Sequence, residues 1–140
     1  MRLALLSLLG FVILTILLVA AIGSWRVFLV FSGKAKANDF KGGVAHGSER
    51  YWRLNRAHIN AAENLPILAT LVFLGVYQEI GTPWFDYIAF SILIFRLLQT
   101  YFLVFCFSNI IANVRFVSFS LQILGYGALV LMIAVNYLNY

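Results

Sequence analysis

The first long uncharged stretch of the chain runs from Leu3 to Trp25, between Arg2 and Arg26. About 20 apolar residues in a helix are enough to cross the roughly 30 Å hydrocarbon core of a bilayer. Residues 97–114 and 116–140 also lack charge. The chain is 63% hydrophobic and 11% charged, whereas soluble domains carry about a quarter charged residues. A soluble fold of this composition would expose large apolar patches, so the sequence predicts an integral membrane protein.

We expect an all-α membrane protein, a bundle of four transmembrane helices that forms one domain over residues 1–140. The expected helices cover about 3–31, 49–78, 83–107 and 114–138. Glycines and charged residues punctuate a first loop over about 32–48, and short turns are expected near 79–83 and 108–113.

The basic residues are concentrated near the first loop. Seven of the ten Lys and Arg lie between Arg26 and Arg56, and the turn from Glu79 to Asp86 has none. Basic loops stay in the cytoplasm, so we expect the first loop to be cytoplasmic and both termini to lie outside. This clustering explains the net charge of +5 as a topology signal with some attraction to anionic lipid, and no nucleic acid partner is expected.

A polar stripe lies within the second expected helix. Arg56, Asn60 and Glu63 are spaced i, i+4 and i+7, which stacks them on one helix face about 10 Å deep. Glu49 and Arg53 extend this stripe toward the first loop. A carboxylate at membrane depth costs about 2.5–3.5 kcal/mol, so Glu63 needs a partner or a water-filled cleft. Two interpretations are open: a structural ladder that joins helices, or a site for a small zwitterion, with Arg for its carboxylate and Glu for its ammonium.

Two further arginines lie among apolar residues. Arg96 is midway along the third expected helix, and Arg115 opens the fourth. An arginine at membrane depth usually faces a bundle interior or a cavity. The alternatives are pairing of Arg96 with Glu63 or with backbone carbonyls, and snorkelling of Arg115 to the interface.

Other chemistries find little support. The single cysteine, Cys106, is flanked by apolar residues, which favours a packing role. His58 points away from the stripe and His46 lies in the loop, so no metal site is expected. The sequence has no Ser-His-Asp pattern, phosphate loop or dinucleotide fingerprint.

The pattern of the second helix resembles the signature of the MAPEG family, the membrane-associated proteins in eicosanoid and glutathione metabolism. The matching run is Arg56-Ala57-His58-x-Asn60-x-x-Glu63-x-x-Pro66. The likeness extends through Gly47-Ser48-Glu49-Arg50 and through Leu68-Ala69-Thr70-Leu71. The length, the four helices and the basic first loop are also similar, and the chain looks like a microsomal glutathione transferase.

This resemblance implies a homotrimer with glutathione, a co-substrate, in a cytoplasm-facing cleft between neighbouring subunits. Arg26 occupies a place where members often have a glutathione-binding arginine. Arg115 resembles the family's catalytic arginine, which stabilises the glutathione thiolate. The candidate glutathione-binding residues are Arg26, Arg53, Arg56, Asn60, Glu63, Arg96 and Gln99.

Three functional hypotheses follow. The first is an enzyme that conjugates glutathione to lipophilic electrophiles or reduces lipid hydroperoxides. The second is a member that binds glutathione or a small anion without catalysis, because many members carry His or Tyr where this chain has Gln99 and Leu103. The third is a purely structural membrane trimer.

Overall fold

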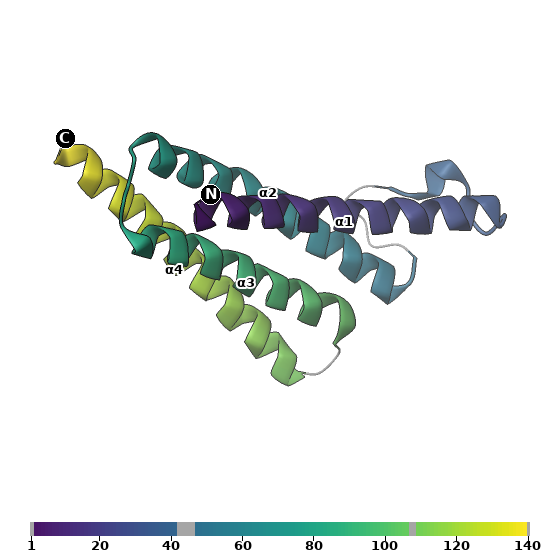
Figure 1. Ribbon diagram of the computed structural model, residues 1–140. Coiled ribbons are helices and arrows are strands. Elements are labelled where there is room, and N and C mark those ends of the chain that lie inside the picture. The colour runs from purple at the N-terminus through teal and green to yellow at the C-terminus, as the bar shows by residue number, and fades with distance from the viewer. Residues whose placement is uncertain (1, 42–46, 107–108, 140) are drawn as a thin grey trace.

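Four long helices make up the chain. The computed structural model describes residues 2–41, 47–106 and 109–139, and for 109–112 the backbone alone. These residues form α1 (Leu3–Phe31), a short 3-10 helix η1 (Ala37–Asp39), α2 (Glu49–Tyr77), α3 (Pro83–Phe105) and α4 (Asn109–Leu138) (Figure 1). The predicted all-α class is confirmed.

Each of the four helices is long and apolar enough to cross a membrane. Only 22–33% of the residues in their most apolar windows are buried, so most of their apolar side chains face outward. Leu17, Phe73 and Leu131 are each more than 60% exposed. Lipid tails solvate such a surface whereas water does not, and the structure therefore fits an integral multi-pass membrane protein.

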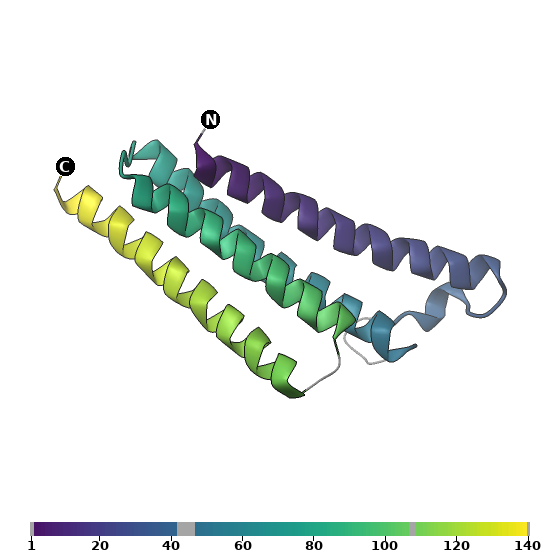
Figure 2. The same ribbon diagram turned by 60° about the horizontal axis from the view of Figure 1, so that its bottom comes forward.

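The third helix is the centre of the bundle. It packs against each of the other three helices, and Figure 2 shows it between α1 and α4. The second helix packs against α1, α3 and, less extensively, α4. One end of the bundle contains the last residues of α1 and α3 and the first residues of α2 and α4. We call it the first-loop end.

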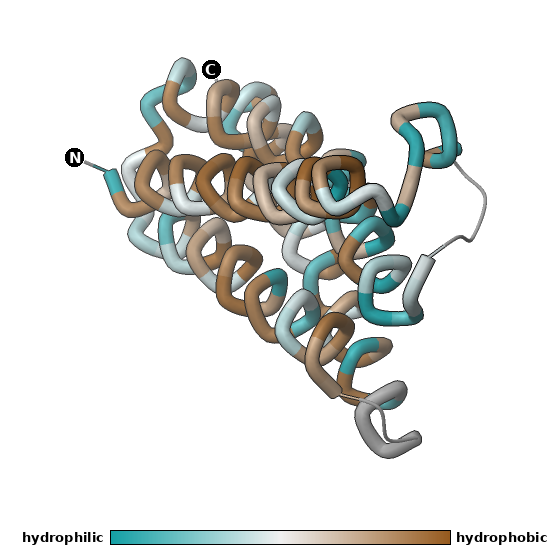
Figure 3. The backbone as a smooth tube through the Cα atoms, turned by 90° about the vertical axis from the view of Figure 1, so that its right-hand side faces the viewer, coloured by the Kyte–Doolittle hydropathy of each residue, from teal (hydrophilic) through white to brown (hydrophobic). Residues whose placement is uncertain are grey.

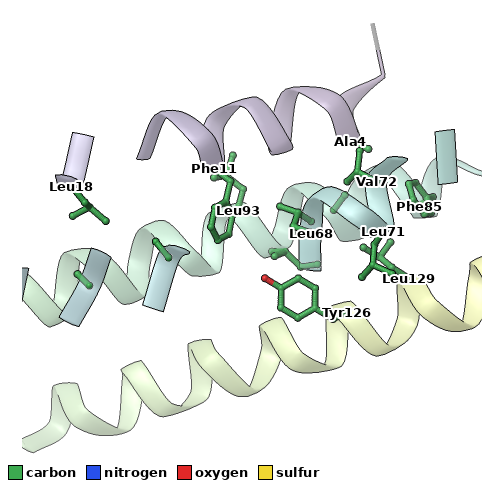
Figure 4. Packing of buried hydrophobic residues seen from close by; sticks show 14 of the residues in the cluster. Ala4, Phe11, Leu18, Leu68, Leu71, Val72, Phe85, Leu93, Tyr126 and Leu129 are labelled. Carbon is green, nitrogen blue, oxygen red and sulfur yellow. The ribbon is translucent and has the colours of Figure 1, made fainter. Parts of the chain in front are cut away.

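Large apolar side chains fill the interior between the helices. Phe11, Leu68, Phe85 and Leu129 are almost fully buried there (Figure 4). The close approach of α2 to α3 depends on Gly75, because a Cβ at this position would overlap the Phe85 ring. Interhelical contacts through small residues are typical of membrane bundles, where close packing replaces the hydrophobic effect between helices.

Polar groups define several helix ends. The Ser48 hydroxyl accepts a hydrogen bond from the Tyr51 backbone N–H at 3.3 Å and so caps α2. The backbone N–H of Ala4, in the first turn of α1, donates to Asp86 of α3 at 3.1 Å. A carboxylate from a neighbouring helix thus satisfies one of the free N–H groups that every helix start leaves.

Two helix bounds differ from those expected. The turn predicted over 108–113 is wrong from Asn109 on, because α4 already begins there. The run Asn109-Ile110-Ile111-Ala112-Asn113 contains neither Gly nor Pro, so nothing in it breaks a helix. The third helix ends at Phe105, with Cys106 as its C-cap, rather than near 107.

Candidate functional site

The polar stripe of α2 lies on the outside of the subunit. Arg56 and Glu63 are exposed, and Asn60 is half-buried. The buried face of α2 is offset from the stripe by one residue and includes Ala57, Ala61, Asn64 and Leu68. Successive helical residues are about 100° apart, which turns the stripe away from the bundle. Within the described part of the chain, neither Arg56 nor Glu63 forms a salt bridge or a hydrogen bond.

Glu63 is the middle residue of α2, which spans Glu49–Tyr77. At 1.5 Å per residue, about 21 Å of helix lies on either side of it. Asn64, the next residue, faces inward and donates from Nδ2 to the Asn60 carbonyl at 2.7 Å. An exposed carboxylate halfway along a membrane-spanning helix faces either lipid, at high cost, or a polar partner from outside the subunit.

Arg26 is held in place at the first-loop end. Its Nε donates to the Tyr51 hydroxyl at 2.7 Å, and its Nη2 lies 3.5 Å from Asn55 Oδ1. The guanidinium carbon also lies 5.4 Å from the centre of the Phe40 ring, a cation–π distance. Figure 3 shows hydrophilic residues gathered on the η1 loop and the first turns of α2. The structure therefore fixes this cation among other polar groups.

Arg53 joins the start of α2 to the end of α3. It forms a salt bridge with Glu49 at 2.6 Å, and its Nη1 donates to the Cys106 carbonyl at 2.9 Å. The carbonyl is one of those that a helix C-terminus leaves without a partner. Arg53 thus has a structural role beside its predicted role in glutathione binding.

Arg96 lies inside the bundle, apart from the exposed stripe. It is 1% exposed, and its guanidinium carbon lies 5.4 Å from the centre of the Phe11 ring. Its Nε and Nη2 are buried without a hydrogen-bond partner among the described residues. The ion pair with Glu63 that the sequence left open is not formed within the subunit, because Glu63 faces outward.

Gln99 and Arg115 lie on neighbouring helices and differ in their surroundings. Gln99 is half-buried and accepts a hydrogen bond at 3.0 Å from Nε2 of Gln122 on α4. Arg115 is half-buried in the second turn of α4, near the first-loop end. The structure of one subunit therefore brings Gln99 next to α4, while Arg115 remains partly open to the outside.

Sequence reasoning missed the buried polar residues of α4. Ser118, Gln122 and Tyr126 are each less than 7% exposed. They follow Arg115 at i+3, i+7 and i+11, the spacing of one helix face, so the sequence contained the signal. Figure 4 shows the Tyr126 ring reaching from α4 into the bundle.

An apolar groove separates α2 from α4 beyond the stripe. Its first part, of about 630 Å³, begins at Pro66 and includes Tyr126 in its wall. Its second part, of about 910 Å³, continues from Leu71 and Val130 to Tyr137. The groove thus starts one turn after Glu63 and is open to the membrane side of the subunit.

The sequence matches the MAPEG family over residues 4–135. The chain belongs to the MAPEG family. No curated protein matches the chain. The family is associated with glutathione and includes transferases and peroxidases as well as members without catalysis. The match covers all four helices and places the exposed stripe of α2 in a MAPEG framework.

Proposed function

We propose that the protein is a glutathione-dependent membrane enzyme of the microsomal glutathione transferase type. It conjugates glutathione to lipophilic electrophiles or reduces lipid hydroperoxides. The observation that carries the proposal is the pair of unpartnered charges, Arg56 and Glu63, on the exposed face of α2 in a chain of this family. Glutathione carries both carboxylates and an ammonium group, so it complements both charges.

A homotrimer completes the site in this proposal. The exposed stripe faces a neighbouring subunit, which removes Arg56 and Glu63 from lipid and forms one wall of a glutathione cleft. Arg26 is suited to the second wall, because Tyr51 and Asn55 already hold its guanidinium in a fixed direction. The basic first loop supports a cytoplasmic position for this cleft, with both termini outside.

The chemistry needs a thiolate. A free thiol has a pKa of about 8.5, so little of it is ionised at neutral pH. The half-buried Arg115 near the first-loop end supplies a permanent positive charge that favours the anion. In conjugation, the thiolate sulfur bonds to the electrophilic carbon and the leaving group departs with the bonding electrons.

Peroxide reduction uses the same thiolate. The sulfur attacks one peroxide oxygen, the O–O bond breaks, and the lipid leaves as an alcohol after taking up a proton. A second glutathione then displaces hydroxide, which leaves as water, and forms glutathione disulfide. The groove that begins at Pro66 offers an apolar approach for either lipophilic substrate.

A second candidate function is glutathione binding without turnover. It is favoured by Gln99, which is engaged with Gln122 where many members place a His or Tyr for glutathione. Turnover decides between the two. Purified protein in detergent should conjugate a chlorinated nitrobenzene or reduce a lipid hydroperoxide with glutathione, and Arg115→Ala should lose most of that rate. Saturable glutathione binding without either reaction would establish the second candidate instead.

A further inference from the structure

The side chains of Gln99 and Gln122 join α3 to α4. Gln122 is fully buried, and its Nε2 donates to Gln99 Oε1 and to the Ser118 carbonyl, both at 3.0 Å. A side-chain amide has two N–H bonds, so these two contacts use both of them. Gln122 therefore holds the Gln99 oxygen from a position that is itself anchored to the backbone of α4.

The Ser118 carbonyl determines which way round the two amides lie. A backbone carbonyl accepts hydrogen bonds and cannot donate, so it requires the Nε2 of Gln122 on its side. The reverse orientation would set two acceptors against each other and would bury the NH2 group of Gln122 without an acceptor. The observed orientation leaves a smaller deficit, because within this pair only Gln122 Oε1 is buried without a partner among the described residues.

This polarity leaves the donor end of Gln99 free. Its Oε1 accepts from Gln122, and its Nε2 donates to no group among the residues that the structure describes. Gln99 is half-buried, and its Nε2 is not enclosed by the bundle. A ligand that reaches Gln99 therefore meets two N–H donors and no acceptor.

Gln99 lies level with the polar stripe of α2. The two helices run in opposite directions, and Arg53 of α2 contacts the Cys106 carbonyl that follows α3. Asn60 is seven residues after Arg53 and Gln99 is seven before Cys106, so an equal rise per residue brings them to the same depth. The tight glycine contact between α2 and α3 near their other ends gives the same register to within one residue. The Gln99 donor is thus at the depth of the site proposed for glutathione.

We propose that Gln122 is a positioning residue that makes Gln99 a hydrogen-bond donor to glutathione. The inference rests on the proposed glutathione site and adds its polarity. The NH2 group of Gln99 binds a carboxylate or carbonyl oxygen of the tripeptide and repels its ammonium group, which is left to Glu63. Gln122 touches no ligand, because it is fully buried, and acts through Gln99 alone.

A double-mutant cycle on glutathione affinity tests this coupling. Calorimetry of the full-length protein in detergent compares the wild type with Gln99→Met, Gln122→Met and the double variant, since Met keeps the length of the side chain and removes the amide. Each single variant should bind about three- to tenfold more weakly, the range for loss of one hydrogen bond. The double variant should stay within about twofold of Gln99→Met, because Gln122 then has nothing to orient.

A purely structural role for Gln122 gives a different result. Its loss would then weaken binding by the same factor with and without Gln99, and losses that multiply in the double variant would overturn the proposal. Wild-type affinity of either single variant would also overturn it. Asn136→Leu is the matched control, because Asn136 forms another amide contact from α4, 3.4 Å from the Gln78 carbonyl, and should bind glutathione within about twofold of wild type.

Nuclear magnetic resonance of the wild type supplies a readout that does not depend on variants that fold. The chain has three glutamines, Gln78, Gln99 and Gln122, so side-chain 15N labelling of glutamine gives three NH2 groups to assign. Without glutathione, the Gln122 protons should exchange slowly with solvent and the Gln99 protons quickly, and saturating glutathione should slow and shift the Gln99 signals. Protected Gln99 protons beside rapidly exchanging Gln122 protons would overturn the orientation of the pair. Unchanged Gln99 signals in protein that binds glutathione would overturn the contact, whereas absence of any glutathione binding would overturn the proposed function itself.

Discussion

Arg26, near the end of α1, donates a 2.7 Å hydrogen bond to the hydroxyl of Tyr51 in the first turn of α2. This contact joins the two ends of the first loop, and the Tyr51 side chain is itself 4% exposed. A hydrogen bond to a charged group contributes about 1.5–3 kcal/mol, more than one between neutral partners. The arginine is thereby pre-oriented before any ligand arrives.

Removal of this acceptor should weaken glutathione binding. Arg26 keeps Asn55 in the Tyr51→Phe variant, so we expect a loss of about 1 kcal/mol, or roughly fivefold in affinity. Tyr87→Phe is the matched control, because Tyr87 is exposed on the lipid-facing side of α3. Titration of each variant with glutathione checks the difference, and equal affinities would show that Arg26 is not a ligand.

The stripe of α2 should be covered in the assembled protein. Native mass spectrometry from mild detergent should give three copies of the 15.8 kDa chain, because lipid exposure of Arg56 and Glu63 is costly. The trimer prediction fails if a monomer retains its fold and still binds glutathione.

The contact between Gly75 and Phe85 should be sensitive to a single methyl group. Gly75→Ala forces the added Cβ into a ring that is 1% exposed, and overpacking of this kind costs about 1–3 kcal/mol. Gly23→Ala is the control, because nothing lies within 4 Å of a Cβ at that position. Thermal unfolding in detergent should show a lower midpoint for the first variant only.

Arg115 should control the ionisation of bound glutathione. Ultraviolet absorbance of the thiolate, titrated against pH, should place the pKa of the bound thiol well below the free value of about 8.5. Arg115→Ala should raise that pKa toward the free value, because the variant loses the charge that favours the anion, and should lower conjugation. The reverse outcome, with Arg96→Ala abolishing the thiolate and Arg115→Ala leaving it intact, would exchange the roles of the two arginines. Cys106→Ser should change neither quantity.

Much of the fold follows from local pattern. Uncharged runs of transmembrane length predicted α1 and most of α4, and the i, i+4, i+7 spacing placed Arg56, Asn60 and Glu63 on one face. The start of α4 was predicted too late, although the run from Asn109 to Asn113 contains no Gly or Pro that would break a helix. Polar residues without Gly or Pro are therefore a weak signal for a turn, because a helix can begin within such a run.

The positions of the other site residues depend on tertiary packing. The spacing of the stripe does not say which side of α2 the bundle buries, and only the packing of Ala57 and Ala61 turns Glu63 outward. The contact of Arg53 with the Cys106 carbonyl joins residues far apart in sequence. Burial of Arg96 likewise depends on Phe11 and Tyr126, which come from two other helices.

Isothermal titration calorimetry of the detergent-purified protein with glutathione tests the central claim most directly. Wild-type protein should bind glutathione, and Arg56→Ala and Glu63→Gln should each weaken binding at least tenfold, because loss of one partner of a desolvated charge pair costs about 2–5 kcal/mol. Glu49→Gln, at the exposed start of α2, should bind within about twofold of wild type, since an exposed ion pair contributes about 0–1 kcal/mol. Absence of binding to wild-type protein at millimolar glutathione, or full binding by both Arg56→Ala and Glu63→Gln, would contradict the proposed site.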